Sequence, residues 1–148
     1  MSLYVDADAC PVRAEAEAVA ARHGQRVIFV SNGGIRPSSA PHAEMVYVDA
    51  GADAADRWIA ERAGAGDVVI TADIPLAARC VAAGARVLRP DGSALTEANI
   101  GTTLAMRDLM ADLRAADPFR QGASKPFGKA DRARFRDALD AALRAAAQ

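Results

Sequence analysis

Short apolar runs that alternate with helical segments constrain this fold more than any other feature of the sequence. Five runs of strand length lie between residues 3 and 88, and most are separated by stretches with helical spacing of apolar residues. Such alternation predicts an α/β fold with a central parallel sheet and right-handed crossovers. The expected strands are 3–5, 26–31, 45–48, 67–73 and 85–88, and the expected helices are about 11–22, 53–62, 75–83, 96–116 and 131 onward.

Two of the expected strands end in aspartates. Asp6 and Asp8 follow the first strand, and Asp73 follows the fourth. The strand order 3-2-1-4-5 places these two strands side by side, at the point where ligands bind in open parallel sheets. We therefore expect Asp6 and Asp73 to meet, with Asp8 just beyond, although Asp8 could instead cap the helix that Pro11 begins.

A third acid is expected from the start of the 53–62 helix. Asp53 and Asp56 occupy its N-cap and first turn, so either carboxylate could complete the cluster. Acids at these positions also stabilise a helix on their own, through capping and the helix dipole. The sequence leaves both interpretations open, and it does not decide between the two aspartates.

The ligand chemistry of such a cluster suits Mg²⁺ or Mn²⁺. It contains only carboxylates, and zinc sites are usually built from cysteine and histidine. Cys10 and Cys80 have no CxxC spacing and are expected to be reduced, buried thiols. A carboxylate-bound hard cation commonly serves phosphodiester or phosphomonoester chemistry, because it neutralises the phosphate and activates water.

Groups that could contact phosphate are spread over a loop and the C-terminal region. Residues 1–106 carry 9 basic and 13 acidic groups, whereas residues 107–148 carry 9 basic and 6 acidic groups. This asymmetry fits a metal site beside a phosphate-binding surface, and it also fits an ordinary solvated helix. The glycine-rich loop after Ser31 could donate backbone N–H groups to an anion, or it could be a plain connection. The candidate phosphate or nucleic-acid contacts are Ser31, Asn32, Arg36, Lys125, Lys129 and Arg132.

Length and composition limit the remaining possibilities. The 148 residues, 51% of them hydrophobic, predict one domain over 1–148 with a single core. Aromatic residues make up only 5%, which argues against a platform for base stacking. No apolar run approaches the roughly 18 residues of a membrane span, and no signal-peptide pattern is present, so we expect a cytoplasmic protein. The oligomeric state stays open, a homodimer included.

Several motifs resemble the bacterial YaiI/YqxD family. They are D-A-D-A-C-P-V, D-A-A-D, G-D-V-V-I-T-A-D-I-P-L-A-A, T-E followed by N-I, and a late P-F…D-R…F, and together they cover almost the whole chain. The family is classed with PIN-like domains, so the resemblance implies a three-layer α/β/α fold and a metal-dependent nuclease site. The implied ligands are Asp6, Asp53 or Asp56, and Asp73, with Asp8 and Asp91 as acidic neighbours.

The leading functional hypothesis is a Mg²⁺- or Mn²⁺-dependent ribonuclease in which Asp6, Asp53 and Asp73 hold the metal and Asp8 or Asp56 positions water. One alternative is a catalytically degenerate PIN-like domain that binds RNA or protein. Another is a haloacid-dehalogenase-type phosphatase, since V-D-A-D resembles its nucleophile strand. Against the phosphatase, Ala9-Cys10 departs from that motif, and the pair Gly66-Asp67 precedes its strand instead of following one.

Overall fold

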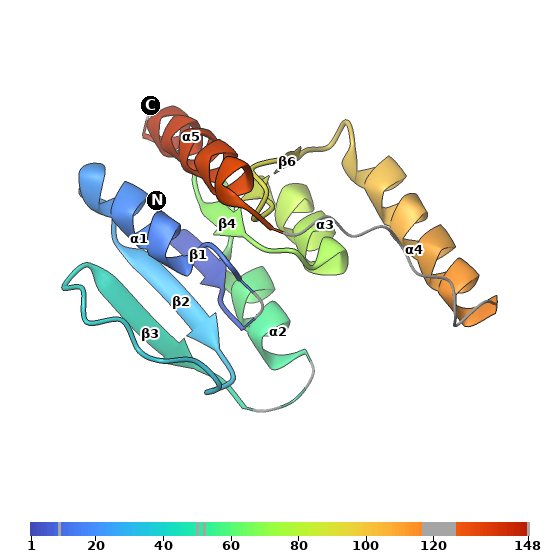
Figure 1. Cartoon of the computed structure of the whole chain (residues 1–148), viewed down its shortest axis with the longest axis horizontal. Helices are drawn as coiled ribbons and strands as arrows, with labels where there is room; N and C mark the ends of the chain where they lie inside the picture. Colours follow the sequence, from blue (N-terminus) through green and yellow to red (C-terminus); the bar gives the residue numbers. More distant parts are fainter. Residues whose placement is uncertain (9, 50, 52, 117–126, 148) are drawn as a thin grey trace.

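A six-stranded sheet with the order β3-β2-β1-β4-β5-β6 organises the computed structural model, which describes residues 1–8, 10–49, 51, 53–116 and 127–147. Helices cover both faces of this sheet (Figure 1). The elements are β1 (Leu3–Asp6), α1 (Arg13–Arg22), β2 (Val27–Ser31), β3 (Ala43–Tyr47), α2 (Ala54–Arg62), β4 (Val68–Ile70), α3 (Ile74–Ala82), β5 (Arg86–Leu88), β6 (Ala94–Leu95), α4 (Ile100–Ala116) and α5 (Lys129–Ala146).

Strand β1 is the centre of the sheet and pairs in parallel with both β2 and β4. Val5 lies opposite Phe29 on one side and Ile70 on the other. The predicted order 3-2-1-4-5 is thereby confirmed. The structure adds β6, which pairs antiparallel with β5 and makes the sheet mixed. A two-residue strand is too short to show any periodicity, so residue patterns do not predict it.

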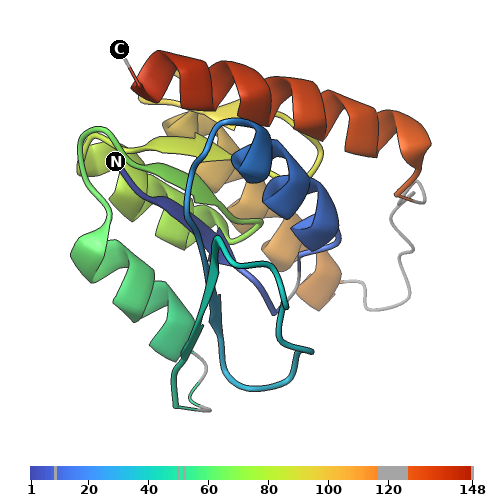
Figure 2. The same ribbon diagram turned by 90° about the vertical axis from the view of Figure 1, so that its left-hand side faces the viewer.

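The two faces of the sheet carry different sets of helices. Helices α1 and α5 run side by side over one face, as Figures 1 and 2 show from two directions, and α2 and α3 cover the other. The terminal helix contributes Phe135, Leu139 and Leu143, all fully buried, to the first core. Among the described residues, no helix has the length and apolar character needed to cross a membrane.

Helix α4 packs chiefly against α3 and lies at the edge of the domain (Figure 1). It begins at Ile100, and the expected start near Thr96 is wrong. The Asn99 side chain accepts a hydrogen bond from the Thr96 N–H at 2.8 Å and donates to the Ala94 carbonyl at 2.9 Å, which favours a turn over a helix there. Met110 on this helix is 38% exposed.

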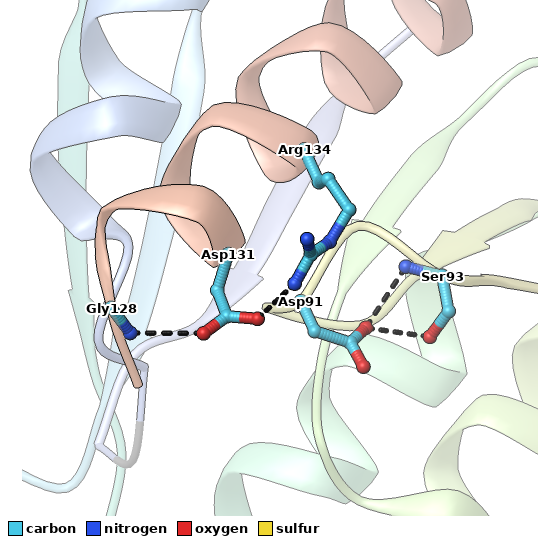
Figure 3. A network of polar contacts seen from close by, with 5 residues as sticks. All are labelled: Asp91, Ser93, Gly128, Asp131 and Arg134. Carbon is cyan, nitrogen blue, oxygen red and sulfur yellow. Dashed lines mark hydrogen bonds and ion pairs between the residues drawn. The ribbon is translucent and has the colours of Figure 1, made fainter. Parts of the chain in front are cut away.

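The turn between β5 and β6 lies against the start of α5 (Figure 3). Asp91 accepts hydrogen bonds from the Ser93 N–H at 2.9 Å and the Ser93 hydroxyl at 2.6 Å. On the helix, Asp131 accepts the Gly128 N–H at 2.9 Å and pairs with Arg134. These local contacts shape the turn and the helix start separately, and their backbones then pack together.

Candidate functional site

Thr71 joins the carboxyl ends of β1 and β4. Because Val5 lies opposite Ile70, the next residue of each strand, Asp6 and Thr71, are neighbours. The Thr71 hydroxyl donates to Asp6 Oδ2 at 2.9 Å and accepts the Asp73 N–H at 3.0 Å. Thr71 is only 1% exposed, so this link is shielded from water. The structure thus places Asp6 and Asp73 at one edge of the sheet, on either side of a buried hydroxyl.

Asp73 also begins helix α3. Its Oδ1 accepts the Leu76 N–H at 2.9 Å, which is N-cap geometry, and Pro75 occupies the first turn. This structural role accounts for one oxygen of the carboxylate. The position of Asp73 is consequently fixed by the strand on one side and the helix on the other.

Asp56 is the third acid of the cluster. Burial raises its pKa to about 7, assisted by a side-chain hydrogen bond with Asp73 and by the negative charges of Asp73, Asp6 and Asp53. Asp53 stands at the N-cap position of α2 but makes no capping hydrogen bond through its side chain. Of the two aspartates that the sequence could not separate, Asp56 is the one in contact with Asp73.

The cluster carries negative charge without a visible counter-charge. Burial raises the pKa of Asp6, with the Thr71 hydrogen bond acting against it and the charges of Asp73 and Asp8 adding to it. No ion pair found in the described part of the chain involves Asp6, Asp56 or Asp73. Such a group attracts either a proton, as the pKa of Asp56 shows, or a cation.

The residues fit Mg²⁺ or Mn²⁺ in kind, because every donor is a carboxylate oxygen. In their present orientations, however, no three acidic, histidine or cysteine side chains among the described residues surround one position. Coordination by three carboxylates therefore requires Asp6, Asp56 or Asp73 to turn toward a shared ion. A cation bound there would also offset the negative charges of Asp73, Asp6 and Asp53, which add to the effect of burial on the pKa of Asp56.

Asp8 turns toward β2. It accepts a hydrogen bond from the Ser31 hydroxyl at 2.6 Å and another from the Asn32 N–H at 3.0 Å. It does not cap α1, since Val12 occupies that N-cap position and provides no side-chain bond. The donors of Ser31 and Asn32 do bind an anion, and that anion is the chain's own Asp8 carboxylate.

The basic candidates are in different situations. Arg36 and Lys129 are exposed. Arg132 donates to the Pro11 carbonyl at 2.6 Å, pairs with Glu15 at 3.1 Å and lies over the Phe127 ring. Arg132 therefore ties α5 to α1. Lys125 lies outside the described residues.

Sequence reasoning gave no separate role to Thr71, whose side chain organises the site. The signal was present in the strand pairing: the first residue after β4 must lie beside the last residue of β1. A hydroxyl at that position is suited to bind a carboxylate on the neighbouring strand. Arg13 was also missed, because nothing in its local sequence marks it, and it lines a cavity next to the cluster.

Comparison with known proteins places the chain among bacterial relatives. A family model described as "Uncharacterized BCR, YaiI/YqxD family" matches residues 4–145. A UPF0178 protein of Cereibacter sphaeroides is 67% identical over 146 residues, 99% of this chain and 91% of the relative. UPF0178 proteins of Ruegeria pomeroyi and Rhizobium etli are 70% and 54% identical, over 98% and 97% of this chain and 95% and 92% of their own. No solved structure matches.

Proposed function

The chain belongs to the YaiI/YqxD family, and we propose that its aspartate cluster binds Mg²⁺ or Mn²⁺ and supports hydrolysis of phosphodiester bonds in RNA. The observation that carries the proposal is the contact of Asp56 with Asp73, close to Asp6, with no cation paired to any of the three in the described chain. An uncompensated carboxylate group at strand ends suits a hard divalent ion.

The three aspartates share one task in this proposal. Asp6, Asp56 and Asp73 hold the ion. The negative charge of Asp53 acts on Asp56, but the Asp53 side chain is exposed, so Asp53 is a weaker candidate than Asp56 for the third ligand. When bound, the ion would neutralise the scissile phosphate and lower the pKa of a water molecule. Thr71 keeps Asp6 in place through its hydrogen bond. The protein is expected to act in the cytoplasm.

The test is cleavage of single-stranded RNA by the purified protein with Mn²⁺ or Mg²⁺. We expect Asp6→Asn and Asp73→Asn each to reduce cleavage at least about 100-fold, since each removes a ligand charge. Asp137→Asn is the matched control, because Asp137 is exposed on α5, away from the cluster. Cleavage that persists in both cluster variants would overturn the proposal.

A second candidate is an RNA- or protein-binding domain without hydrolytic activity. It is favoured by the finding that no three described side chains now surround one position. A thermal melt separates the candidates, because an ion that binds only the folded state must raise the melting temperature. A Mn²⁺-dependent rise that Asp6→Asn abolishes supports the proposed site, and the absence of both a rise and cleavage favours the binding domain.

A further inference from the structure

A cavity of about 560 Å³ adjoins the aspartate cluster. It lies between the start of α1 and the loop that joins β2 to β3. Cys10 lines this cavity and also a smaller one of about 280 Å³ that contains Asp6 and Asp73. The two cavities therefore share a wall, and the larger one is of a size typical for small-ligand sites.

The lining of the larger cavity combines apolar side chains with two arginines and one glutamate, Glu17. Phe29, which is buried, contributes apolar surface together with the half-buried Ile35 and Met45. Arg13 and Arg36 also line it. Neither arginine takes part in an ion pair found in the described part of the chain. The cavity thus combines an apolar surface with two guanidinium groups that are available to an anion.

The loop wall of the cavity is fastened to helix α1. The Ser38 hydroxyl hydrogen-bonds to the Glu17 carboxylate, and His42 Nε2 lies 2.9 Å from the Glu17 carbonyl oxygen. The Asp8 bonds to Ser31 and Asn32 fix the beginning of the same loop. A wall anchored in this way keeps the cavity open in the absence of a ligand, which lowers the entropic cost of binding.

We propose that this cavity is a nucleotide subsite: the nucleobase enters against Ile35 and Met45, and Arg13 and Arg36 bind the adjoining phosphate. Guanidinium groups bind phosphate through paired, charge-assisted hydrogen bonds, and an apolar wall suits the faces of a base. The shared wall at Cys10 places the next phosphodiester toward Asp6. The subsite extends the proposed function to substrate binding, and the path of the RNA strand toward Asp6 rests on that proposed function.

Binding of adenosine 5′-monophosphate, measured by calorimetry in EDTA, tests the subsite without any metal. Ala14 is exposed on α1 and lines the cavity, whereas Ala18, one turn along the same helix, is exposed and does not line it. Ala14→Trp should fill the cavity and weaken binding at least about tenfold, and Ala18→Trp should bind as the wild type does. Equal affinity of the two tryptophan variants would overturn the proposal.

Arg36 is tested separately, which covers the case that Ala14→Trp disturbs the fold. Arg36→Ala should weaken binding of the mononucleotide about tenfold. The control is Arg26→Ala, which should not weaken binding, because Arg26 pairs with Glu44 elsewhere on the surface. Inorganic phosphate and adenosine should each bind more weakly than the mononucleotide. Binding of inorganic phosphate as tight as that of the mononucleotide would refute a role for the base.

The outcomes also separate this inference from the metal-dependent reaction. Asp6→Asn should bind the mononucleotide normally in EDTA, because Asp6 does not line the larger cavity. Normal binding in a protein that cleaves no RNA upholds the subsite and removes the proposed hydrolysis. If cleavage requires Asp6 but neither Ala14→Trp nor Arg36→Ala changes the affinity for the mononucleotide, the subsite is refuted and the proposed hydrolysis is not.

Discussion

Thr71 is a single buried side chain on which two parts of the acidic cluster depend. Its hydroxyl donates to Asp6 and accepts from the Asp73 backbone, and it is almost inaccessible to water. Valine has nearly the same shape but no hydroxyl, so Thr71→Val would leave the Asp73 N–H without a partner. An unpaired buried polar group costs about 1–3 kcal/mol, more than the hydrogen bond itself contributes.

We therefore expect Thr71→Val to lower the free energy of unfolding by about 1–3 kcal/mol, measured by urea denaturation. Thr71→Ser keeps the hydroxyl and is the matched control. It should lose less stability than the valine variant despite removing a methyl group. A valine variant as stable as the serine variant would show that these hydrogen bonds do not support the site.

Asp56 makes stability depend on pH. Its unfolded pKa is near 3.8 and its folded pKa about 7, so the folded protein binds the extra proton between these values. By linkage, the stability of the metal-free protein falls as pH rises from about 4 to about 7 and then levels off. The loss is on the order of 1 kcal/mol, because solvent screens this partly exposed carboxyl.

Asp56→Asn should reduce that decline, to which Asp6 also contributes through its raised pKa, and the variant should exceed the wild type in melting temperature above pH 7. Melts in EDTA from pH 4 to pH 8, with Asp137→Asn as the control, measure the difference. If wild type and Asp56→Asn showed parallel pH profiles, the proton would not lie on Asp56.

Residue patterns predicted part of the site for identifiable physical reasons. Asp6 and Asp73 could be predicted because both follow apolar runs of strand length, and the predicted strand order then placed them together. Asp53 and Asp56 could not be separated, because both positions suit the start of any helix. Only the packing of α2 decides which one reaches Asp73.

The turn between β5 and β6 packs closely against the backbone of α5 at Gly92. Gly92 has φ +90°, and a Cβ at this position would lie 2.8 Å from both the carbonyl carbon and oxygen of Arg134. Gly66 has the similar φ of +89° but nothing within 4 Å of its Cβ position. Both glycines therefore have a positive φ, but only Gly92 is in close contact with the backbone of another element.

Gly66→Ala should cost about 1 kcal/mol from the unfavourable positive φ alone. Gly92→Ala should cost about 3 kcal/mol, because it adds an overpacking penalty against backbone that cannot move aside. Urea denaturation of both variants isolates the contact as the difference between them. Equal losses would mean that the turn can withdraw from α5 without cost.

Long apolar runs and helical spacing predicted the first five strands and the sheet order, because these are properties of whole segments. The elements that were misplaced depend on single side chains. Asn99 delays α4 to Ile100, and β6 exists only because the Asp91 turn returns the chain beside β5. Both features are determined by hydrogen bonds of single side chains, and the periodicity of apolar residues does not predict such bonds.

In the C-terminal helix α5, three of the five basic side chains are paired with the chain's own acids. Arg144 pairs with Asp140 at 2.8 Å, Arg134 pairs with Asp131, and Arg132 is held by Glu15. His23 also hydrogen-bonds to Asp140, at 2.7 Å, from the end of α1. The Arg132–Glu15 and His23–Asp140 contacts fasten α5 to α1, whereas the other two pairs lie within α5 itself.

The salt dependence of RNA binding should reflect this distribution of charge. Among the described residues, the cations that line the proposed subsite are Arg13 and Arg36, and we propose Lys129 at the start of α5 as a third phosphate contact. Three contacts on a single strand predict that log Kd rises with log salt with a slope of about 2. Arg36→Ala should lower that slope by about 0.7, and Arg136→Ala, on an exposed part of α5, should leave it unchanged. A slope near 4 would instead require the three paired arginines of α5 to release their acids and bind phosphate.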